Sequence, residues 1–198
     1  GVDWRRETFN GKSFGAVKIA ISADSLAEGA KTIYVAGAYS DDNKTRRLGL
    51  LKTTDGGAKW EVLPLPENLT KEVAWTARIY FTDAQTGWLG AGNDGLIIQT
   101  TDGGQTWTEC SLPTKEQRLS ALWFDGKGYG LAAVYNLDIQ QVRDTLYKTL
   151  DGGKNWQMLL GGKKCVESIF SLDGRKIWAV GDVPGHVYND LVVIIERK

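Results

Sequence analysis

One eight-residue motif occurs three times in this 198-residue chain, and its spacing limits the possible folds more than any other feature. The motif reads Thr-x-Asp-Gly-Gly-x-x-Trp and covers residues 53–60, 100–107 and 149–156. Its aspartates recur every 47 to 49 residues. A period of this length is close to that of a unit of four β-strands and longer than most helical repeats. The chain is therefore expected to consist of repeated β-sheets.

Short apolar or alternating runs surround each motif in the same order. In the second unit, runs at 77–81, 87–92 and 95–100 precede the motif, and one at 107–112 follows it. Similar runs occur at 17–21, 32–36 and 49–52, at 120–124, 129–133 and 145–148, and at 167–170, 177–181 and 191–195. Runs of this length between turn residues are typical of antiparallel strands. The second run of each unit carries a large aromatic residue that is expected to pack between units: Tyr34, Trp88, Tyr129 and Trp178.

The repeat predicts an all-β chain that forms one domain over residues 1–198, a four-bladed β-propeller with about four strands per blade. The blades are expected at approximately 11–66, 67–114, 115–162 and 163–198 plus 1–10. The last blade lacks its own motif, but the N-terminal Gly-x-x-Trp that ends at Trp4 matches the end of the motif. The strand after Trp4 is therefore expected to complete the fourth blade and close the ring.

The motif itself is interpreted as a hairpin device that serves folding. Its aspartate can accept hydrogen bonds from amides of the turn, its glycines supply positive φ, and its tryptophan covers the hairpin. The residues assigned to this structural role are Asp55, Trp60, Asp102, Trp107, Asp151 and Trp156, together with Trp4.

This pattern resembles the Asp-box, or BNR, repeat of sialidases and, more closely, the Ycf48-like photosystem II assembly factors. The likeness is greatest over residues 87–107. The resemblance implies a propeller scaffold that binds a protein partner outside the cytoplasm, in the periplasm or after secretion. The chain departs from both relatives, because Ycf48-like propellers have more blades and sialidases have six. The Arg-Ile-Pro motif of sialidases is approached only at residues 77–80, where tyrosine replaces the proline.

Three short segments fit catalytic or ligand-binding patterns by letter only. Residues 11–15 match a nucleophile elbow around Ser13, but no helix is expected to follow and His186 is the lone histidine. Residues 90–95 match a dinucleotide glycine pattern and are interpreted as a hairpin turn. Residues 41–43 offer oxygen ligands for calcium without EF-hand spacing and are expected to form a solvated turn. The sequence thus favours a chain without catalytic residues, metal or cofactor.

Candidate binding residues lie near the starts of the innermost strands, where a propeller directs side chains at its central channel. They are Lys18, Trp75, Arg78, Arg118 and Glu167. A basic rim with one aromatic residue could hold an acidic peptide or an anionic sugar, and solvated charges at loop ends are the alternative. Glycoside hydrolysis needs two carboxylates about 5 to 10 Å apart, for which the sequence offers Glu167 and possible loop acids such as Glu72 and Asp125.

Charge and composition restrict the partner. The 24 Lys plus Arg balance 24 Asp plus Glu, which argues against nucleic acid or an anionic membrane as partner. No apolar run approaches the length of about 18 residues that membrane insertion requires. Two cysteines are too few for a disulfide framework or a zinc site. We therefore expect a monomeric scaffold that binds a protein or peptide through its channel face or its loops, with a carbohydrate-binding or sialidase-like glycoside hydrolase module as the alternative.

Overall fold

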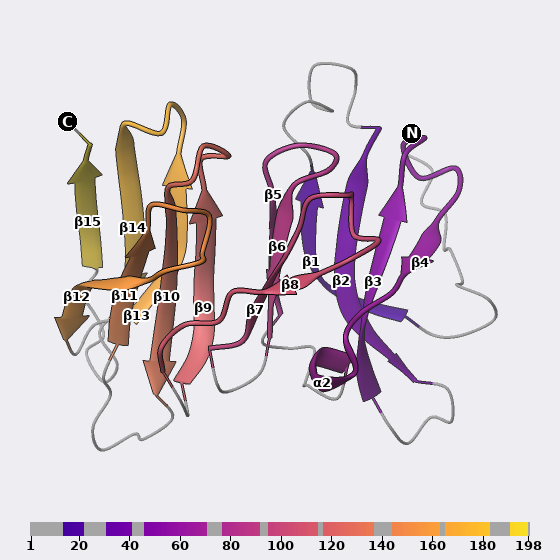
Figure 1. The fold of residues 1–198 in the computed structure, drawn as a ribbon, viewed down its shortest axis with the longest axis horizontal. Helices are drawn as coiled ribbons and strands as arrows, with labels where there is room; N and C mark the ends of the chain where they lie inside the picture. The colour runs from indigo at the N-terminus through magenta and orange to yellow at the C-terminus, as the bar shows by residue number, and fades with distance from the viewer. Residues whose placement is uncertain are drawn as a thin grey trace, which may run out of the picture.

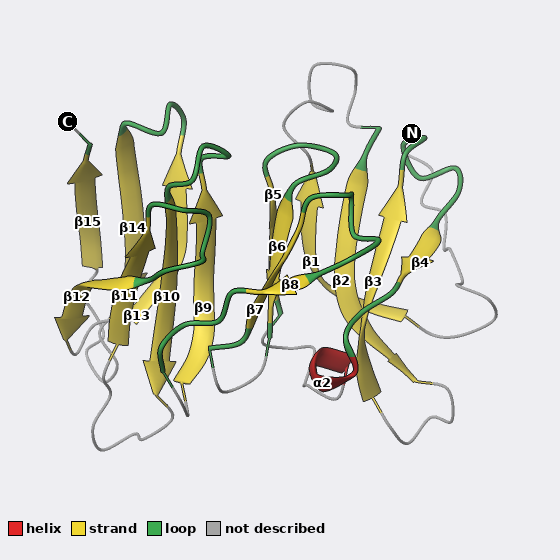
Figure 2. Cartoon of the chain, in the orientation of Figure 1, coloured by secondary structure: helices red, strands yellow, loops and turns green. Residues whose placement is uncertain are grey.

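The computed structural model describes residues 14–21, 31–40, 46–70, 77–91, 95–114, 117–136, 144–162, 165–182 and 191–197. These residues form four antiparallel sheets in a row, each made of strands that are consecutive in the sequence (Figures 1 and 2). The first sheet contains β1 (Phe14–Ile21), β2 (Ile33–Ser40), β3 (Arg46–Thr53) and β4 (Glu61–Leu63), and the second contains β5 (Arg78–Phe81), β6 (Gly87–Gly90), β7 (Ile97–Thr100) and β8 (Thr108–Glu109). The third contains β9 (Gln117–Phe124), β10 (Gly130–Asn136), β11 (Asp144–Thr149) and β12 (Gln157–Gly162), and the fourth contains β13 (Cys165–Ser171), β14 (Lys176–Asp182) and β15 (Leu191–Glu196). A short helix, α2 (Glu67–Thr70), follows β4.

The sheets are arranged as blades of a β-propeller are, which confirms the predicted all-β fold. The first strands β1, β5, β9 and β13 contact one another in this order. Within the described residues the row remains open, because the first and fourth sheets lie at its opposite ends (Figure 1). Residues 1–10, which the sequence assigns to the fourth blade, lie outside the described part of the chain. The four-blade ring therefore stays a prediction.

The core consists of three apolar layers between neighbouring sheets. Because successive residues of a strand point to opposite faces of its sheet, the inner sheets contribute to two layers each. The layer between the first and second sheets includes Leu50, Leu89 and Ile98, the next includes Ile97, Leu122 and Val134, and the last includes Leu131, Leu146 and Ile177. Each such buried side chain stabilises the fold by about 1.5 to 3 kcal/mol. Packing between sheets is thus what holds the row together.

Aromatic stacking joins each of the first two sheets to the next. Tyr34 of β2 stacks on Phe81 of β5 with ring centroids 3.6 Å apart, and Trp88 of β6 stacks on Phe124 of β9 at 3.7 Å. The two phenylalanines pair in register with glycines, Gly87 and Gly130. A Cβ on either glycine would lie 2.4 Å or less from the phenylalanine ring. Glycine therefore lets the ring lie flat between the two sheets.

The predicted aromatic position in the third sheet is wrong. The register places Leu131 of β10 opposite Trp123, where the first two sheets place Tyr34 opposite Ala20 and Trp88 opposite Tyr80. Tyr129 precedes β10. The sequence repeat suggests the aromatic residue as the common position, whereas in the structure Gly130 is equivalent to Gly87, because each lies opposite a phenylalanine.

A β-bulge recurs in the first strand of three sheets. The register shifts between Ala16 and Lys18 in β1, opposite Ala133 and Val134 in β9, and between Val166 and Ser168 in β13. In β9 and β13 the residues left out of the pairing are Ser120 and Glu167. A bulge frees backbone groups and turns its extra residue away from the regular alternation. Of the predicted channel residues, Glu167 lies at such a bulge, and Lys18 and Arg118 lie beside one.

Candidate functional site

The three motifs form nearly identical hairpins. In each, the threonine Oγ1 donates to the aspartate Oδ1 at 2.8 Å and accepts the amide of the second glycine at 2.8 to 2.9 Å. The aspartate Oδ1 also accepts the amide four residues onward at 2.9 Å. Hydrogen bonds from side chains and amides of the turn, the first from the Thr106 side chain in Asp102 and from the Asn155 side chain in Asp151, lower the pKa of each aspartate to about 2. These carboxylates hold their own turns, as residues with a folding role do.

The tryptophans of the second and third motifs also contact the preceding sheet. Trp107 Nε1 donates to the carbonyl of Pro64, just after β4, at 3.0 Å. Trp156 Nε1 donates to the carbonyl of Cys110, just after β8, at 2.9 Å. Burial raises the pKa of the Cys110 thiol to about 12, so this cysteine is unreactive. The indoles therefore join the sheets, a role that the motif alone does not reveal.

The structure brings Arg78 and Glu167 together in a small cavity of about 130 Å³, which Ser120 also lines and which we call the channel cavity. Arg78 Nε donates to the carbonyl of Ser120, and its Nη1 donates to the carbonyl of Ala77 at 2.9 Å. Burial lowers the pKa of Arg78, and the charge of Glu167 acts in the opposite direction. Arg78 thus satisfies a carbonyl at the β9 bulge and links two sheets. Part of its binding capacity is already used by the fold.

The other predicted channel residues are not among the described residues that line this cavity. Arg118 lies in β9 opposite Tyr135 and is not among the lining residues. Lys18 lies in β1 beside the bulge, where only the backbone is described. Trp75 lies outside the described residues, as do Trp4, Ser13, Glu72, residues 41–43 and His186. Among the described residues, Arg78 and Glu167 are thus the predicted channel residues that line this cavity.

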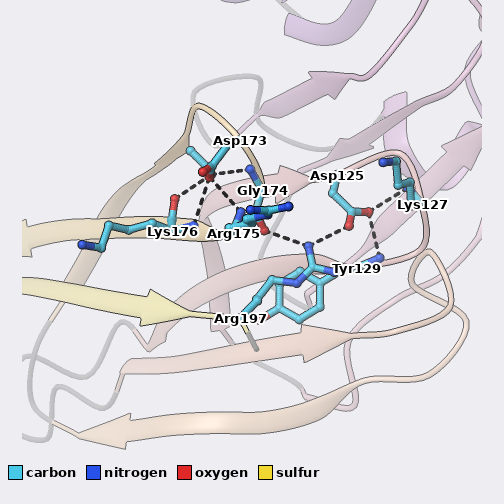
Figure 3. Close-up of polar contacts among 9 residues, drawn as sticks. Asp125, Lys127, Tyr129, Asp173, Gly174, Arg175, Lys176 and Arg197 are labelled. Atoms are coloured by element: carbon cyan, nitrogen blue, oxygen red, sulfur yellow. Dashed lines mark hydrogen bonds and ion pairs between the residues drawn. The ribbon is translucent and has the colours of Figure 1, made fainter.

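A larger groove of about 680 Å³, which we call the loop-side groove, lies between turns of the second, third and fourth sheets. It is at the ends of the first strands that are opposite to the small cavity. Its apolar wall comes from Tyr80, Trp123 and Phe124, and Leu172 stands at its rim with 83% of its surface exposed. Figure 3 shows its polar residues, which come from the β9–β10 turn, the β13–β14 turn and the end of β15: Asp125, Lys127, Asp173, Arg175 and Arg197. Sequence reasoning missed this groove.

Arg197 is fixed in place at this groove. Its Nη1 donates to Asp125 Oδ2 at 2.8 Å and to the carbonyl of Gly174 at 2.9 Å. Its guanidinium lies 4.1 Å from the centre of the Tyr129 ring, within cation–π range. An arginine has five N–H donors, and Nη1 supplies two of them. The donors on Nε and Nη2 make no hydrogen bond to the described part of the chain.

A second repeated aspartate shapes the turns between first and second strands. Asp125 Oδ1 accepts the amides of Lys127 and Tyr129 at 2.7 and 3.0 Å, and Asp173 Oδ1 accepts those of Arg175 and Lys176 at 2.8 and 3.1 Å. Asp83 makes the same kind of turn in the second sheet. These backbone hydrogen bonds lower the pKa of Asp173. The sequence signal is an aspartate one or two positions after each of these three first strands.

The groove combines cationic groups with an apolar wall. The side chains of Lys127 and Arg175 are exposed and make no ion pair with the described residues. Asp173 has a lowered pKa, which is the opposite of what a general acid needs. Among the described residues, no three His, Cys, Asp or Glu side chains are grouped to hold a metal ion, and no helix is long and apolar enough to cross a membrane. The arrangement suits binding of an acidic ligand with an apolar part.

Sequence comparison places the chain among known proteins. A family model for the photosynthesis system II assembly factor YCF48 matches residues 44–163. The photosystem II assembly lipoprotein Ycf48 of Synechococcus sp. (strain CC9902) is 36% identical over 110 residues, which cover 54% of this chain and 29% of that protein. Its counterpart in Picosynechococcus sp. is 28% identical over 164 residues, which cover 57% of this chain and 48% of that protein. The chain thus spans less than half of the length of these relatives.

Solved structures show the same fold at low identity. A GH74 enzyme from Niastella koreensis has a TM-score of 0.69 at 16% identity, over 92% of this chain and 28% of that one. A structure of YCF48 bound to a D1 peptide has a TM-score of 0.54 at 18% identity, over 91% of this chain and 57% of that one. Since the family model covers more than half of the sequence, the chain belongs to the photosynthesis system II assembly factor YCF48 family.

Proposed function

We propose that this chain is a non-catalytic scaffold that binds an acidic segment of a protein partner in the loop-side groove. The observation that carries this proposal is the groove itself, with a volume of about 680 Å³, an aromatic wall and a cationic rim. Ligand sites commonly have volumes of about 300 to 1,000 Å³. The channel cavity has about 130 Å³, and its arginine is bound to backbone carbonyls. The groove is therefore the better binding surface of the two.

Arg197 is suited to recognise a carboxylate in this groove. Its position is fixed by Asp125 and Tyr129, so little side-chain entropy is lost when a ligand binds. Nε and Nη2 together can donate two parallel hydrogen bonds to one carboxylate. Lys127 and Arg175 supply further positive charge from two different turns. Leu172 offers an exposed apolar contact next to them.

The family supports a partner from photosystem II and a location outside the cytoplasm. The solved YCF48 structure holds a D1 peptide, and the curated relatives are named photosystem II assembly lipoproteins. By this relationship the partner of the present chain is a photosystem II polypeptide, bound during assembly. The same names support the periplasmic or otherwise extracytoplasmic location that the repeat implies.

The rival function, glycoside hydrolysis, lacks its chemistry in the described residues. Glu167 is the single acidic residue among those that line the channel cavity. Hydrolysis requires a second carboxylate across the cleft, and one of the two must remain protonated at working pH. In the groove, Asp125 is paired with Arg197, and Asp173 accepts turn amides. These roles are structural and support the non-catalytic interpretation.

A charge-reversal experiment tests the proposal. We expect the double variant Lys127→Glu and Arg175→Glu to bind a fluorescently labelled D1 peptide at least about tenfold more weakly than the wild type, as measured by anisotropy. Lys154→Glu, an exposed change in the third hairpin, should leave the affinity unchanged. Circular dichroism confirms that all three proteins are folded. Equal affinity for the double variant would remove the groove from the function, and no binding by the wild type would overturn the proposed partner.

A further inference from the structure

The second position of the hairpin motif differs among the three repeats. It is Thr54 in the first motif and Thr101 in the second, but Leu150 in the third. Leu150 is 66% exposed, so its side chain contributes little to the stability of the fold. The hydrogen bonds inside the hairpin are the same whether threonine or leucine occupies this position. The hairpin fold therefore does not account for the leucine.

The exposure of this position does not depend on a neighbouring hairpin. Thr54 and Thr101 are exposed as well, although the first and second sheets are each contacted by the hairpin of the next sheet, through Trp107 and Trp156. A hairpin packed in the same way on the third sheet would thus leave Leu150 exposed too. The turns and hairpins of the second and third sheets on this side of the molecule all lie within the described residues.

Leu150 lies beside a turn that lines the loop-side groove. The amide of Gly152 donates to the carbonyl of Gly128 at 2.8 Å, and a Cβ on Gly128 would lie 2.8 Å from the carbonyl oxygen of Leu150. The third hairpin therefore packs directly against the β9–β10 turn. Lys127, which precedes Gly128 in this turn, is one of the cationic residues of the groove (Figure 3). The leucine thus extends the surface of the groove beyond its cationic rim.

The third sheet sets the distance between Leu150 and the fixed arginine of the groove. Leu150 directly follows β11, and Asp125, which accepts a hydrogen bond from Arg197, directly follows β9. Both strands are antiparallel to β10, which lies between them, so they end on the same side of the sheet. Two strand spacings amount to about 10 Å, which about three residues of an extended segment can span. One bound segment can therefore reach both places.

We propose that Leu150 is a specificity-determining residue of the loop-side groove. The acidic segment binds Arg197 through a carboxylate, crosses the β9–β10 turn past Lys127 and places a large apolar side chain against Leu150. The preferred ligand thus carries an apolar residue about three positions from the acidic residue that Arg197 binds. This inference rests on the proposed function of the groove and adds a sequence requirement to its ligand.

Moving the leucine to another hairpin tests this inference. Leu150→Thr gives the third motif the residue of the other two and should weaken binding of the labelled D1 peptide about fivefold, as measured by anisotropy. Thr54→Leu should leave the affinity unchanged, because no described residue of the first sheet lines the groove. The double variant with both changes keeps the overall composition and should bind as weakly as Leu150→Thr. Equal affinity of Leu150→Thr and wild type, or recovered affinity of the double variant, would overturn the inference.

Salt separates the apolar contact from the charges of the groove. The loss caused by Leu150→Thr should be the same at about 0.05 M and about 0.5 M NaCl, since salt screens charges and not apolar contacts. The loss caused by the double variant Lys127→Glu and Arg175→Glu should become smaller at the higher concentration. A loss for Leu150→Thr that disappears in high salt would contradict an apolar contact.

Substituted peptides identify the residue that Leu150 contacts. Each apolar residue of the D1 peptide is replaced in turn by serine. One replacement, about three positions from an acidic residue, should weaken binding to the wild type about fivefold but leave binding to Leu150→Thr unchanged, as expected for two side chains in contact. If no replacement behaves in this way, the inference is wrong.

The two groove proposals fail differently in these measurements. A charge-reversal variant that binds as tightly as the wild type would overturn the function proposed for the groove, and this inference with it. A weakened charge-reversal variant together with an unaffected Leu150→Thr variant would overturn this inference alone. Circular dichroism melting curves should coincide for wild type and Leu150→Thr, because the changed side chain is exposed.

Discussion

Two tryptophans at the same position of two sheets show what the neighbouring sheet contributes. Trp88 lies opposite Tyr80 in the second sheet, and Trp178 lies opposite Phe170 in the fourth. Trp88 is 2% exposed, stacks on Phe124 of the next sheet and donates to the carbonyl of Gly152 at 2.9 Å. Trp178 is only partly buried and has a tilted ring contact with Phe170 of its own sheet at 6.4 Å.

The difference indicates that the repeat sets the position of a residue within its sheet, whereas the neighbouring sheet determines how much that residue contributes to the stability of the fold. The face of the fourth sheet that points away from the third carries Phe170, Val180 and Ile194, all more than 40% exposed. In the second sheet the equivalent face is covered by the third. A side chain that is exposed in the folded state loses little water-exposed area on folding and stabilises little. Equal sequence therefore does not mean equal contribution to stability.

The largest expected effect comes from truncating the covered tryptophan. Trp88→Ala removes a stacked and hydrogen-bonded indole from a packed layer and should lower the free energy of unfolding by about 3 to 5 kcal/mol. Trp178→Ala should lower it by about 1 kcal/mol, because this ring is only partly buried and has only a tilted contact within its own sheet. Urea denaturation followed by tryptophan fluorescence and circular dichroism measures both. Similar losses for the two variants would mean that Trp178 is covered in solution.

The contacts that sequence could predict are local. The strands follow from the apolar runs, and the hairpin hydrogen bonds join residues no more than four positions apart. The repeat therefore predicted the all-β fold and the turn geometry of Asp55 and its equivalents. The same approach misplaced Tyr129, since a repeat alignment has no information on which residue faces a phenylalanine in the next strand.

The candidate sites depend on contacts that are distant in sequence. Arg197 meets Asp125 across 72 positions, and Arg78 meets the carbonyl of Ser120 across 42. Sequence placed Arg78 and Glu167 near the channel because inner-strand starts converge in a propeller. It could not show that Arg78 is bound to backbone carbonyls at a bulge. Nor could it find the groove, which forms where turns of three neighbouring sheets lie side by side.

A second pair of residues extends the comparison to the hairpins. Gly57 and Gly104 occupy the same position in the first and second motifs, with φ of +98° and +93°. Alanine at either site adopts an unfavourable left-handed conformation at a cost of about 1 to 2 kcal/mol. At Gly104 its Cβ would also lie 2.5 Å from Leu63 Cδ1, whereas at Gly57 the nearest atom belongs to Trp60 at 3.6 Å.

Gly104→Ala should therefore be less stable than Gly57→Ala by about 1 to 3 kcal/mol, the usual cost of overpacking. The difference between the two melting curves, measured by calorimetry, isolates the contact between sheets from the backbone strain. A double variant that combines Gly104→Ala with Leu63→Ala should recover part of the extra loss. Identical stabilities would show that the second hairpin moves freely away from β4.

The smallest expected effect concerns acid stability and compares Asp102 with Asp55. Hydrogen bonds, the first from the Thr106 side chain, lower the pKa of Asp102 below the ordinary value of an aspartate, to about 2. Asp55 also has a lowered pKa, chiefly through the amide of Lys59, but its motif has no hydroxyl at the position of Thr106.

A carboxylate whose pKa is lower in the folded state stabilises the protein above its unfolded pKa, and this contribution disappears as the pH falls through the folded pKa. When the pH is lowered from about 4 to about 2, the urea concentration at the midpoint of unfolding of the wild type should therefore decrease. Asp102→Asn should make the midpoint less dependent on pH in that window, and Asp55→Asn should do so to a smaller extent. Equal slopes for wild type and Asp102→Asn would mean that the carboxylate is not held by its turn in solution.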